Sequence, residues 1–327
     1  MTDTTEPSPR DHAGDRRSFP APNPVVAAFD IGSNTIKMTI AQPRADGGLT
    51  VLGTESDTVR LGMGVADSGV LADDRVAAAL AALTGMADRA RAGGAVRLIG
   101  VATEATRTAA NGPAFLEQVR TVVGIDVRVI DGDEEAALTF RGLAAAIDIR
   151  GQIIVADIGG GSTELILALD GDVRFAQSFR LGSGALTDRF VRRDPPGIAE
   201  IDACRDATRD VLCDVSFPTV QTHTTRLVAV GGTGEFLARL VPGGGVLSTK
   251  IIDGVLARLQ RTPAATIAAE LAIPEARARV LPAGVAIVRA LIDVLQPTTI
   301  EVTQSGIRTG LLLAAFAEIA AESTTPI

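Results

Sequence analysis

The sequence contains few of the residue types on which many enzymes and binding proteins depend. Its 327 residues include no Trp, no Tyr, two Cys and two His. Cys204 and Cys213 are too few for a disulfide framework or a cysteine-rich zinc site, and they are typical of a reduced cytoplasmic protein. His12 and His223 disfavour a histidine-based triad or a multi-histidine metal site. Any catalysis must therefore depend on carboxylates, hydroxyls, arginines and backbone amides.

Positive charge is also scarce. Lys and Arg total 31 against 39 Asp and Glu, and the net charge of -8 disfavours a nucleic-acid or anionic-membrane binder. Only Lys37 and Lys250 are lysines, so arginine supplies most of the groups that could bind phosphate. No apolar run approaches the roughly 18 residues that a membrane-spanning helix requires. Residues 1–22 are polar without apolar periodicity, which predicts a disordered tail.

Apolar segments with the periods of strands and helices alternate along the chain, which predicts an α/β protein. Strands are expected at Val25–Phe29, Thr35–Ile40, Leu49–Gly53, Val96–Val101, Val127–Ile130, Ile153–Ala156, Glu164–Leu169, Leu227–Val230 and Ile300–Thr303. Helices are expected at Asp73–Arg91, Pro113–Val123, Asp133–Ile147, Ile198–Val215, Gly234–Leu240, Lys250–Leu259, Pro274–Leu295 and Ile307–Ala321.

The second half of the chain repeats the opening pattern of the first. An apolar strand, Asp-Ile-Gly, small residues, Thr and another apolar strand occur at Asp30 and again at Asp157. A polar stretch around Gly151 separates the copies. We therefore expect two α/β lobes, residues 23–148 and 149–327, with a cleft between them and with the last helix able to pack back onto the first lobe.

Glycine-rich turns follow three of the apolar strands. Glycine permits positive φ and a close approach of backbone to a ligand, and successive free amides bind anions. None of the turns matches the P-loop or the dinucleotide fingerprint, and the first two precede strands, so an ordinary hairpin turn is the alternative. The expected phosphate contacts are Gly32, Ser33, Asn34 and Thr35 in the first turn, Gly159, Gly160, Gly161, Ser162 and Thr163 in the second, and Gly232 in the third.

Carboxylates stand beside these turns. Asp30 and Asp157 each end an apolar strand, and Glu164 closes the second turn. Mg²⁺ prefers oxygen ligands, so these three side chains form a candidate metal site. A carboxylate that merely stabilises the hairpin is the alternative for Glu164.

Together these segments resemble the exopolyphosphatase / guanosine pentaphosphate phosphohydrolase (Ppx/GppA) family, within the actin, sugar kinase and heat-shock ATPase superfamily. The resemblance implies a two-lobed actin-like, ribonuclease H-like fold. The sequence departs from the family pattern at Asp131, where Ser is frequent, in the late helix at Arg277-Ala278-Arg279, and at Arg308-Thr309-Gly310-Leu311. The matching segments are Val59–Gly62, Ala102–Arg107, Gly132–Ala136, Asp157–Glu164, Gly231–Thr233 and Gly306–Leu312.

The resemblance also implies roles for individual residues. Glu135 matches the catalytic glutamate and is expected to act as general base, whereas Glu134 is read as a helix N-terminal acid. Arg107 matches a phosphate-contacting arginine, and Lys37 stands where the family often has a basic residue. Arg308 is expected to be a surface residue, with a second polyanion contact as the alternative.

The expected function is Mg²⁺-dependent hydrolysis of the terminal phosphate of inorganic polyphosphate, with Mn²⁺ or a monovalent cation such as K⁺ as further possibilities. Conversion of guanosine pentaphosphate to the tetraphosphate is the alternative within the family. A non-catalytic sensor of these polyanions and a sugar or acid kinase are rivals from other classes. We expect a cytoplasmic homodimer without nucleic-acid or membrane partners.

Overall fold

The computed structural model describes residues 23–218, 225–240 and 246–324. The expected tail, residues 1–22, and His223 lie outside this part of the chain. The first sheet contains β1 (Val25–Ile31), β2 (Ile36–Pro43), β3 (Leu49–Asp57), β4 (Ala95–Ala102) and β5 (Asp126–Val129). The second contains β6 (Gln152–Ile158), β7 (Thr163–Leu169), β8 (Asp172–Phe179), β9 (Thr225–Val230) and β10 (Thr299–Val302).

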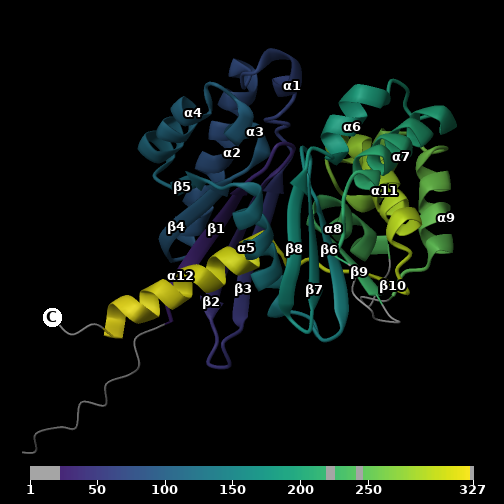
Figure 1. The fold of residues 1–327 in the computed structure, drawn as a ribbon. Coiled ribbons are helices and arrows are strands. Elements are labelled where there is room, and N and C mark those ends of the chain that lie inside the picture. Colours follow the sequence, from purple (N-terminus) through teal and green to yellow (C-terminus); the bar gives the residue numbers. More distant parts are fainter. Residues whose placement is uncertain (1–22, 219–224, 241–245, 325–327) are drawn as a thin grey trace, which may run out of the picture.

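The two sheets have the same topology. Their strand orders are β3-β2-β1-β4-β5 and β8-β7-β6-β9-β10, and in each the first two strand pairs are antiparallel and the last two parallel. Figure 1 shows the sheets side by side, each with its own helices. The predicted two-lobed α/β architecture and its internal repeat are confirmed.

Helices pack on both faces of the sheets. The helices of the first half are α1 (Val65–Ser68), α2 (Asp73–Ala92), α3 (Glu104–Thr108), α4 (Gly112–Gln118), which continues into a π-helical turn (Val119–Val123), and α5 (Gly132–Ala144). Those of the second half are α6 (Ser183–Phe190), α7 (Ile198–Cys213), α8 (Gly231–Leu240), α9 (Thr249–Leu259), α10 (Ala264–Leu271), α11 (Glu275–Leu295) and α12 (Ile307–Thr324). In the described ranges, no helix is long and apolar enough to cross a membrane.

Several short elements were not expected from the sequence. The clearest case is β8, half of whose residues are exposed. It pairs with β7 through a tight Asp170-Gly171 turn in which both residues have positive φ. Asp-Gly between two strands is a strong hairpin signal, so the turn could have revealed the strand.

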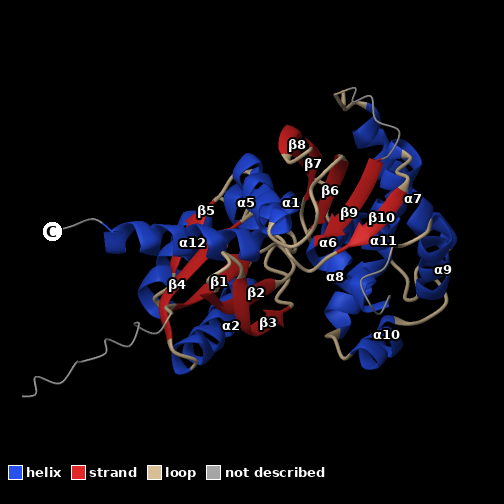
Figure 2. Ribbon diagram, turned by 90° about the horizontal axis from the view of Figure 1, so that it is seen from below, coloured by secondary structure: helices blue, strands red, loops and turns tan. Residues whose placement is uncertain are grey.

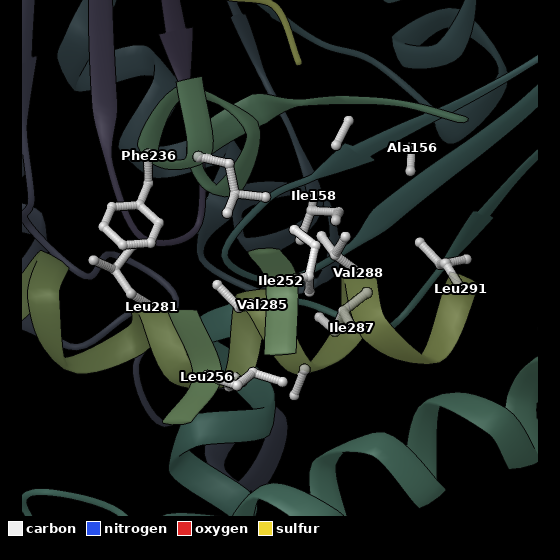
Figure 3. Packing of buried hydrophobic residues seen from close by; sticks show 14 of the residues in the cluster. Ala156, Ile158, Phe236, Ile252, Leu256, Leu281, Val285, Ile287, Val288 and Leu291 are labelled. Carbon is white, nitrogen blue, oxygen red and sulfur yellow. The ribbon is translucent and has the colours of Figure 1, made fainter. Parts of the chain in front are cut away.

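The central strands are buried on both faces, which explains their continuous apolar runs. On β1, Phe29 and Ile31 belong to the core beneath α2, whereas Val26 and Ala28 pack with Leu312 of α12 on the opposite face. In the second lobe, α8 and α11 share one core, and Figure 3 shows the Phe236 ring against Leu281.

Helix α5 lies between the two sheets, next to α12 (Figure 2). Its Phe140 and Leu143 pack on β6 and β7 of the second sheet, whereas Leu138 joins the cluster between α12 and β1. The two helices cross closely: a Cβ at Gly142 would lie 2.1 Å from the Gly306 carbonyl oxygen, and one at Gly310 only 1.9 Å from that of Leu138. The last helix thus packs on the first sheet.

This packing predicts that α12 is part of the stability of the first lobe. Leu312 is fully buried, so Leu312→Ala should leave a cavity and lower the free energy of unfolding by about 2–5 kcal/mol. Leu313, one position along and only partly buried, is the matched control, and Leu313→Ala should cost clearly less. Thermal and urea unfolding measure both. Equal losses would contradict the assigned packing of α12.

Candidate active site

A cavity of about 560 Å³ lies where the two lobes meet. It is lined by the turn after β1, the turn after β6, the start of α8 and the segment that leads into α12. Of the predicted site residues, Asp30, Gly32, Ser33, Asn34, Thr35, Lys37, Glu135, Asp157, Gly159, Gly160, Gly161, Ser162, Glu164 and Gly232 line it. Arg107 and Thr163 do not.

The two hairpin turns have matching local geometry. The Gly32 amide donates to the Thr35 carbonyl oxygen at 3.3 Å, and the Gly159 amide donates to that of Ser162 at 3.0 Å. Both turns are fastened from outside: Ser33 Oγ accepts from the Ala105 amide, and the Gly159 carbonyl accepts from the Ser183 amide. Both turns are therefore preorganised at the carboxyl ends of the central strands β1 and β6.

Contact between the two turns explains the glycines at the tip of the turn after β6. A Cβ at Gly160 would lie 2.3 Å from Asn34 Cβ, and one at Gly161 would lie 2.5 Å from Ser33 Oγ. Neither glycine has positive φ. Left-handed backbone is therefore not the reason for glycine at these two positions. The absent side chain lets the turns of opposite lobes touch.

The third glycine-rich segment is a strand-to-helix junction rather than a free turn. α8 begins at Gly231 directly after β9. Gly231 does have positive φ, 73°, and a Cβ there would lie 2.3 Å from Asp157 Oδ1. Glycine is required here both by conformation and by space. The junction brings Gly232 and Glu235 of α8 to the cavity.

Strand pairing places the charged side chains of the two repeats. In the first hairpin Asp30 is opposite Lys37, and in the second Asp157 is opposite Glu164. Directly opposed residues project from the same face of a sheet. The repeats therefore present an Asp-Lys pair and an Asp-Glu pair to one cavity, with Glu135 of α5 as a fourth carboxylate.

Hydrogen bonds hold two of these carboxylates in position. Thr139 Oγ1 of α5 donates to Asp157 Oδ2 at 2.9 Å, and Ser178 Oγ of β8 donates to Glu164 Oε1 at 2.6 Å. Glu135 Oε2 is buried without a hydrogen-bond partner. A buried polar atom without a partner is costly, and such an atom at a cavity is available to a ligand.

Burial raises the pKa of all four carboxyl groups. It raises the pKa of Asp30 to about 6, against the opposing charge of Lys37, and it raises the pKa of Asp157 above its usual range. Burial, with the charge of Asp157 added, raises the pKa of Glu164 to about 8. The pKa of Glu135 lies well above its usual range because of burial and the neighbouring Glu164.

Arg107 lies behind Glu135 rather than in the cavity. Its guanidinium is hydrogen bonded to Glu104 and donates to the Ile130 carbonyl oxygen at 2.7 Å, and its Nη1 lies 3.7 Å from Glu135 Oε2. This arrangement makes Arg107 a neighbour of the expected base, and its contact with phosphate stays a prediction. The Thr163 hydroxyl donates to the Leu181 carbonyl oxygen, and its contact with phosphate likewise stays a prediction.

Glu134 is placed as expected. It lies in the first turn of α5, which Asp131 caps by accepting from the Glu134 amide at 2.8 Å. Its side chain is paired with Arg128 at the exposed surface. The two adjacent glutamates thus differ sharply in environment, and only Glu135 faces the cavity.

A second charged cluster was not predicted. Glu235 of α8 is ion paired with Lys37 at 2.7 Å, with Arg277 at 2.9 Å and with Arg308 at 3.1 Å. Burial would raise the pKa of Glu235, but Lys37 and Arg308 outweigh it and lower this pKa to about 2. The expectation of a surface position for Arg308 is wrong, since its side chain is 15% exposed and lines the cavity.

One signal of this cluster was present in the sequence. Arg277 falls on the apolar stripe of α11, four residues before Leu281 and seven before Gly284, both of which are buried. A charged residue at such a position must find a partner inside the protein. Nothing comparable identifies Glu235, whose three partners come from distant parts of the chain.

The carboxylates fit a divalent cation of the Mg²⁺ type. Among the residues that the structure describes, no group of three or more His, Cys, Asp and Glu side chains is arranged to hold a metal ion. Mg²⁺ commonly takes only one or two carboxylates and keeps several waters. The cavity gathers three buried carboxyl groups and the partly buried Asp30, and a cation there would stabilise their ionised forms.

Known proteins resemble this chain in sequence and in fold. A sequence model of the Ppx/GppA phosphatase family matches residues 39–318. Exopolyphosphatase 2 of Mycobacterium tuberculosis is 33% identical over 252 residues, which cover 74% of this chain and 77% of the relative. A guanosine-5'-triphosphate,3'-diphosphate pyrophosphatase of Vibrio atlanticus is 27% identical, over 88% of this chain and 58% of its own. The crystal structure of the Aquifex aeolicus Ppx/GppA family member has a TM-score of 0.71 at 27% identity, covering 93% of this chain and 100% of that one.

The raised pKa of Glu164 predicts a pH-dependent stability. An unfolded glutamate loses its proton near its ordinary pKa of 4.5, whereas folded Glu164 keeps the proton to about pH 8. The folded state thus binds more protons between these values, so the free energy of unfolding falls as pH rises through them. Glu164→Gln removes this loss and retains an acceptor for Ser178.

Melting temperatures in chelator at pH 5 and pH 8.5 measure the effect. The variant should gain stability relative to the parent protein at the higher pH, and the gain should shrink in excess Mg²⁺ because the cation stabilises the ionised carboxylate. An unchanged difference between variant and parent at the two pH values would contradict the assigned burial.

Proposed function

The chain belongs to the Ppx/GppA phosphatase family, whose named relatives are phosphoanhydride hydrolases, and we propose that it removes the terminal phosphate of inorganic polyphosphate. The observation that carries this proposal is the meeting at one cavity of two hairpin turns, three buried carboxylates and the partly buried Asp30. A terminal phosphate needs its charge held, a water aimed at phosphorus and a group to accept the proton. The lining residues can supply each of these.

The hairpin turns are the proposed phosphate cradle. Small residues at their tips bring backbone and hydroxyl groups to the cavity from both lobes, at Ser33 and Asn34 on one side and Gly160 and Ser162 on the other. Because the turns are held by hydrogen bonds to their surroundings, they need little reorganisation on binding. Substrate would then lie between the lobes.

Glu135 is the proposed general base. Glu135 lines the cavity and its Oε2 has no hydrogen-bond partner, so the carboxylate can accept the proton of a water. As that water forms its bond to phosphorus, the bond to the bridging oxygen breaks and the proton passes to Glu135. Burial and the neighbouring Glu164 raise the pKa of Glu135, and a higher pKa makes its ionised carboxylate a stronger base for this step.

Arg107 is proposed to position the base. Glu104 and the Ile130 carbonyl hold its guanidinium 3.7 Å from Glu135 Oε2. Its positive charge lowers the pKa of Glu135 against the effects of burial and neighbouring acids. Arg107 would therefore favour the ionised form of Glu135, which is the form that accepts a proton.

Asp30, Asp157 and Glu164 are the proposed ligands of Mg²⁺, with the alternative of Mn²⁺. Bound there, the ion would neutralise charge on the phosphate oxygens and on the leaving group. The Thr139 and Ser178 hydroxyls keep Asp157 and Glu164 oriented toward the cavity. A monovalent cation such as K⁺ remains part of the proposal from family resemblance.

Hydrolysis of guanosine pentaphosphate is the second candidate. The Vibrio atlanticus relative bears the name of that activity. Within the described residues, however, no aromatic side chain lines the cavity, so a guanine base would lack a stacking partner. Polyphosphate, which has no base, is favoured on this ground. From the resemblance we further propose a homodimer. The two unpaired cysteines favour a reducing, cytoplasmic location.

Phosphate release from tripolyphosphate, long-chain polyphosphate and guanosine pentaphosphate tests the substrate. We expect turnover of polyphosphate with Mg²⁺, loss of activity in chelator, and a lower kcat/KM for the guanosine nucleotide. Binding without turnover of any of the three would identify a sensor instead. Turnover that requires both ATP and a second acceptor would identify a kinase.

Glu135→Gln keeps the shape of the side chain and removes its basicity. We expect kcat to fall by about 10²- to 10⁴-fold while substrate still binds. Glu134→Gln is the matched control on the neighbouring exposed residue, and it should change kcat by less than a few-fold. A larger effect at Glu134 than at Glu135 would show that the wrong glutamate has been assigned.

A further inference from the structure

The cluster around Glu235 is a second feature of the cavity that the proposed reaction does not use. One carboxylate there is ion paired with three cations. Glu235 Oε1 contacts Lys37 Nζ and Arg308 Nη2, and Oε2 contacts Arg277 Nη2. All four side chains line the cavity. Within the described chain, none of the three cations is ion paired with another carboxylate. The four side chains therefore carry a net charge of +2, and the charges of Lys37 and Arg308 also act on Asp30 and Asp157.

The members of the cluster come from both lobes. Lys37 lies on β2 and Arg308 at the start of α12, which packs on the first sheet. Glu235 and Arg277 lie on α8 and α11, whose shared core holds Phe236, the neighbour of Glu235, against Leu281 (Figure 3). The cations are further fixed by backbone, since Arg308 donates to the Met38 carbonyl and Arg277 to that of Gly232.

A carboxylate and a phosphate compete for the same donors. Both accept paired hydrogen bonds from guanidinium groups and point-charge contacts from lysine. Three cations at the wall of a phosphate-binding cavity would bind a phosphate group strongly if they were free. In this chain Glu235 already occupies them with short contacts.

We propose that Glu235 is an internal competitor for phosphate, a residue that sets how tightly this cavity holds phosphate groups. This inference rests on the proposed function. In the free protein the carboxylate occupies the three cations and keeps them oriented. A phosphate group of substrate or product must displace it or share the cations with it, so binding is weakened and inorganic phosphate leaves readily.

Glu235→Gln tests the proposal because it removes the charge and keeps the size. With inorganic phosphate as probe, isothermal titration calorimetry should give a dissociation constant about 10- to 100-fold lower than in the parent protein, since one nearby like charge is gone. The KM for tripolyphosphate should fall in parallel, without an increase in kcat. Glu235→Asp, which retains the charge, should stay close to the parent protein.

Glu301→Gln is the matched control. Glu301 forms a comparable half-buried ion pair with Arg226, but neither residue lines the cavity. This variant should leave phosphate binding unchanged. If Glu235→Gln unfolds in the absence of ligand, melting in a phosphate titration and the Glu235→Asp protein still test the inference, because phosphate should stabilise Glu235→Gln far more than it stabilises the parent.

Unchanged or weaker phosphate binding by Glu235→Gln would overturn the proposal and leave Glu235 as a structural link between the lobes. So would equal tightening in the Asp variant, because charge would then not be the cause. The proposed function fails by a different result, which is absence of phosphate release by the parent protein from every polyphosphate. Binding of inorganic phosphate tests Glu235 independently of that outcome.

Discussion

The gathering of four carboxyl groups around one cavity is the constraint on which the rest of the site depends. Burial raises the pKa of Asp30, Asp157, Glu164 and Glu135, and neighbouring acids raise each of these pKa values further. Such an arrangement reduces stability and persists when activity requires it. Lys37 and its neighbours offset part of the charge, and a cation bound with substrate would offset more. The cavity of the free protein therefore needs a cation to balance its ionised carboxylates.

Closeness between the lobes is the second requirement, and it is achieved with small residues. The glycines at the tip of the turn after β6 contact Ser33 and Asn34 of the turn after β1, so both turns line the same cavity. Ion pairs add to this contact, with Lys37 reaching Glu235 across the lobes. Polar groups that converge in this way can enclose a small polyanion even though the protein carries net negative charge.

Local patterns predicted most of the fold and the carboxylate side of the site. The repeat of Asp-Ile-Gly identified both central hairpins, and resemblance selected Glu135 over Glu134. The strand β8 was missed although Val173, Phe175 and Phe179 alternate with other residues along it, because the run is short of apolar residues and half of it is exposed. Glu235 and the buried position of Arg308 were missed for another reason. Whether a charge is buried depends on partners from distant segments, which no local pattern contains.

The close crossing of α5 and α12 at Gly142 and Gly310 has a mechanical consequence. Backbone packed against backbone leaves no room for one helix to slide along the other. Glu135 near the start of α5 and Arg308 near the start of α12 therefore belong to one rigid pair of helices. Any movement of one lobe relative to the other would carry these two helices together. The spacing between Glu135 and Arg308 would then stay constant during such a movement.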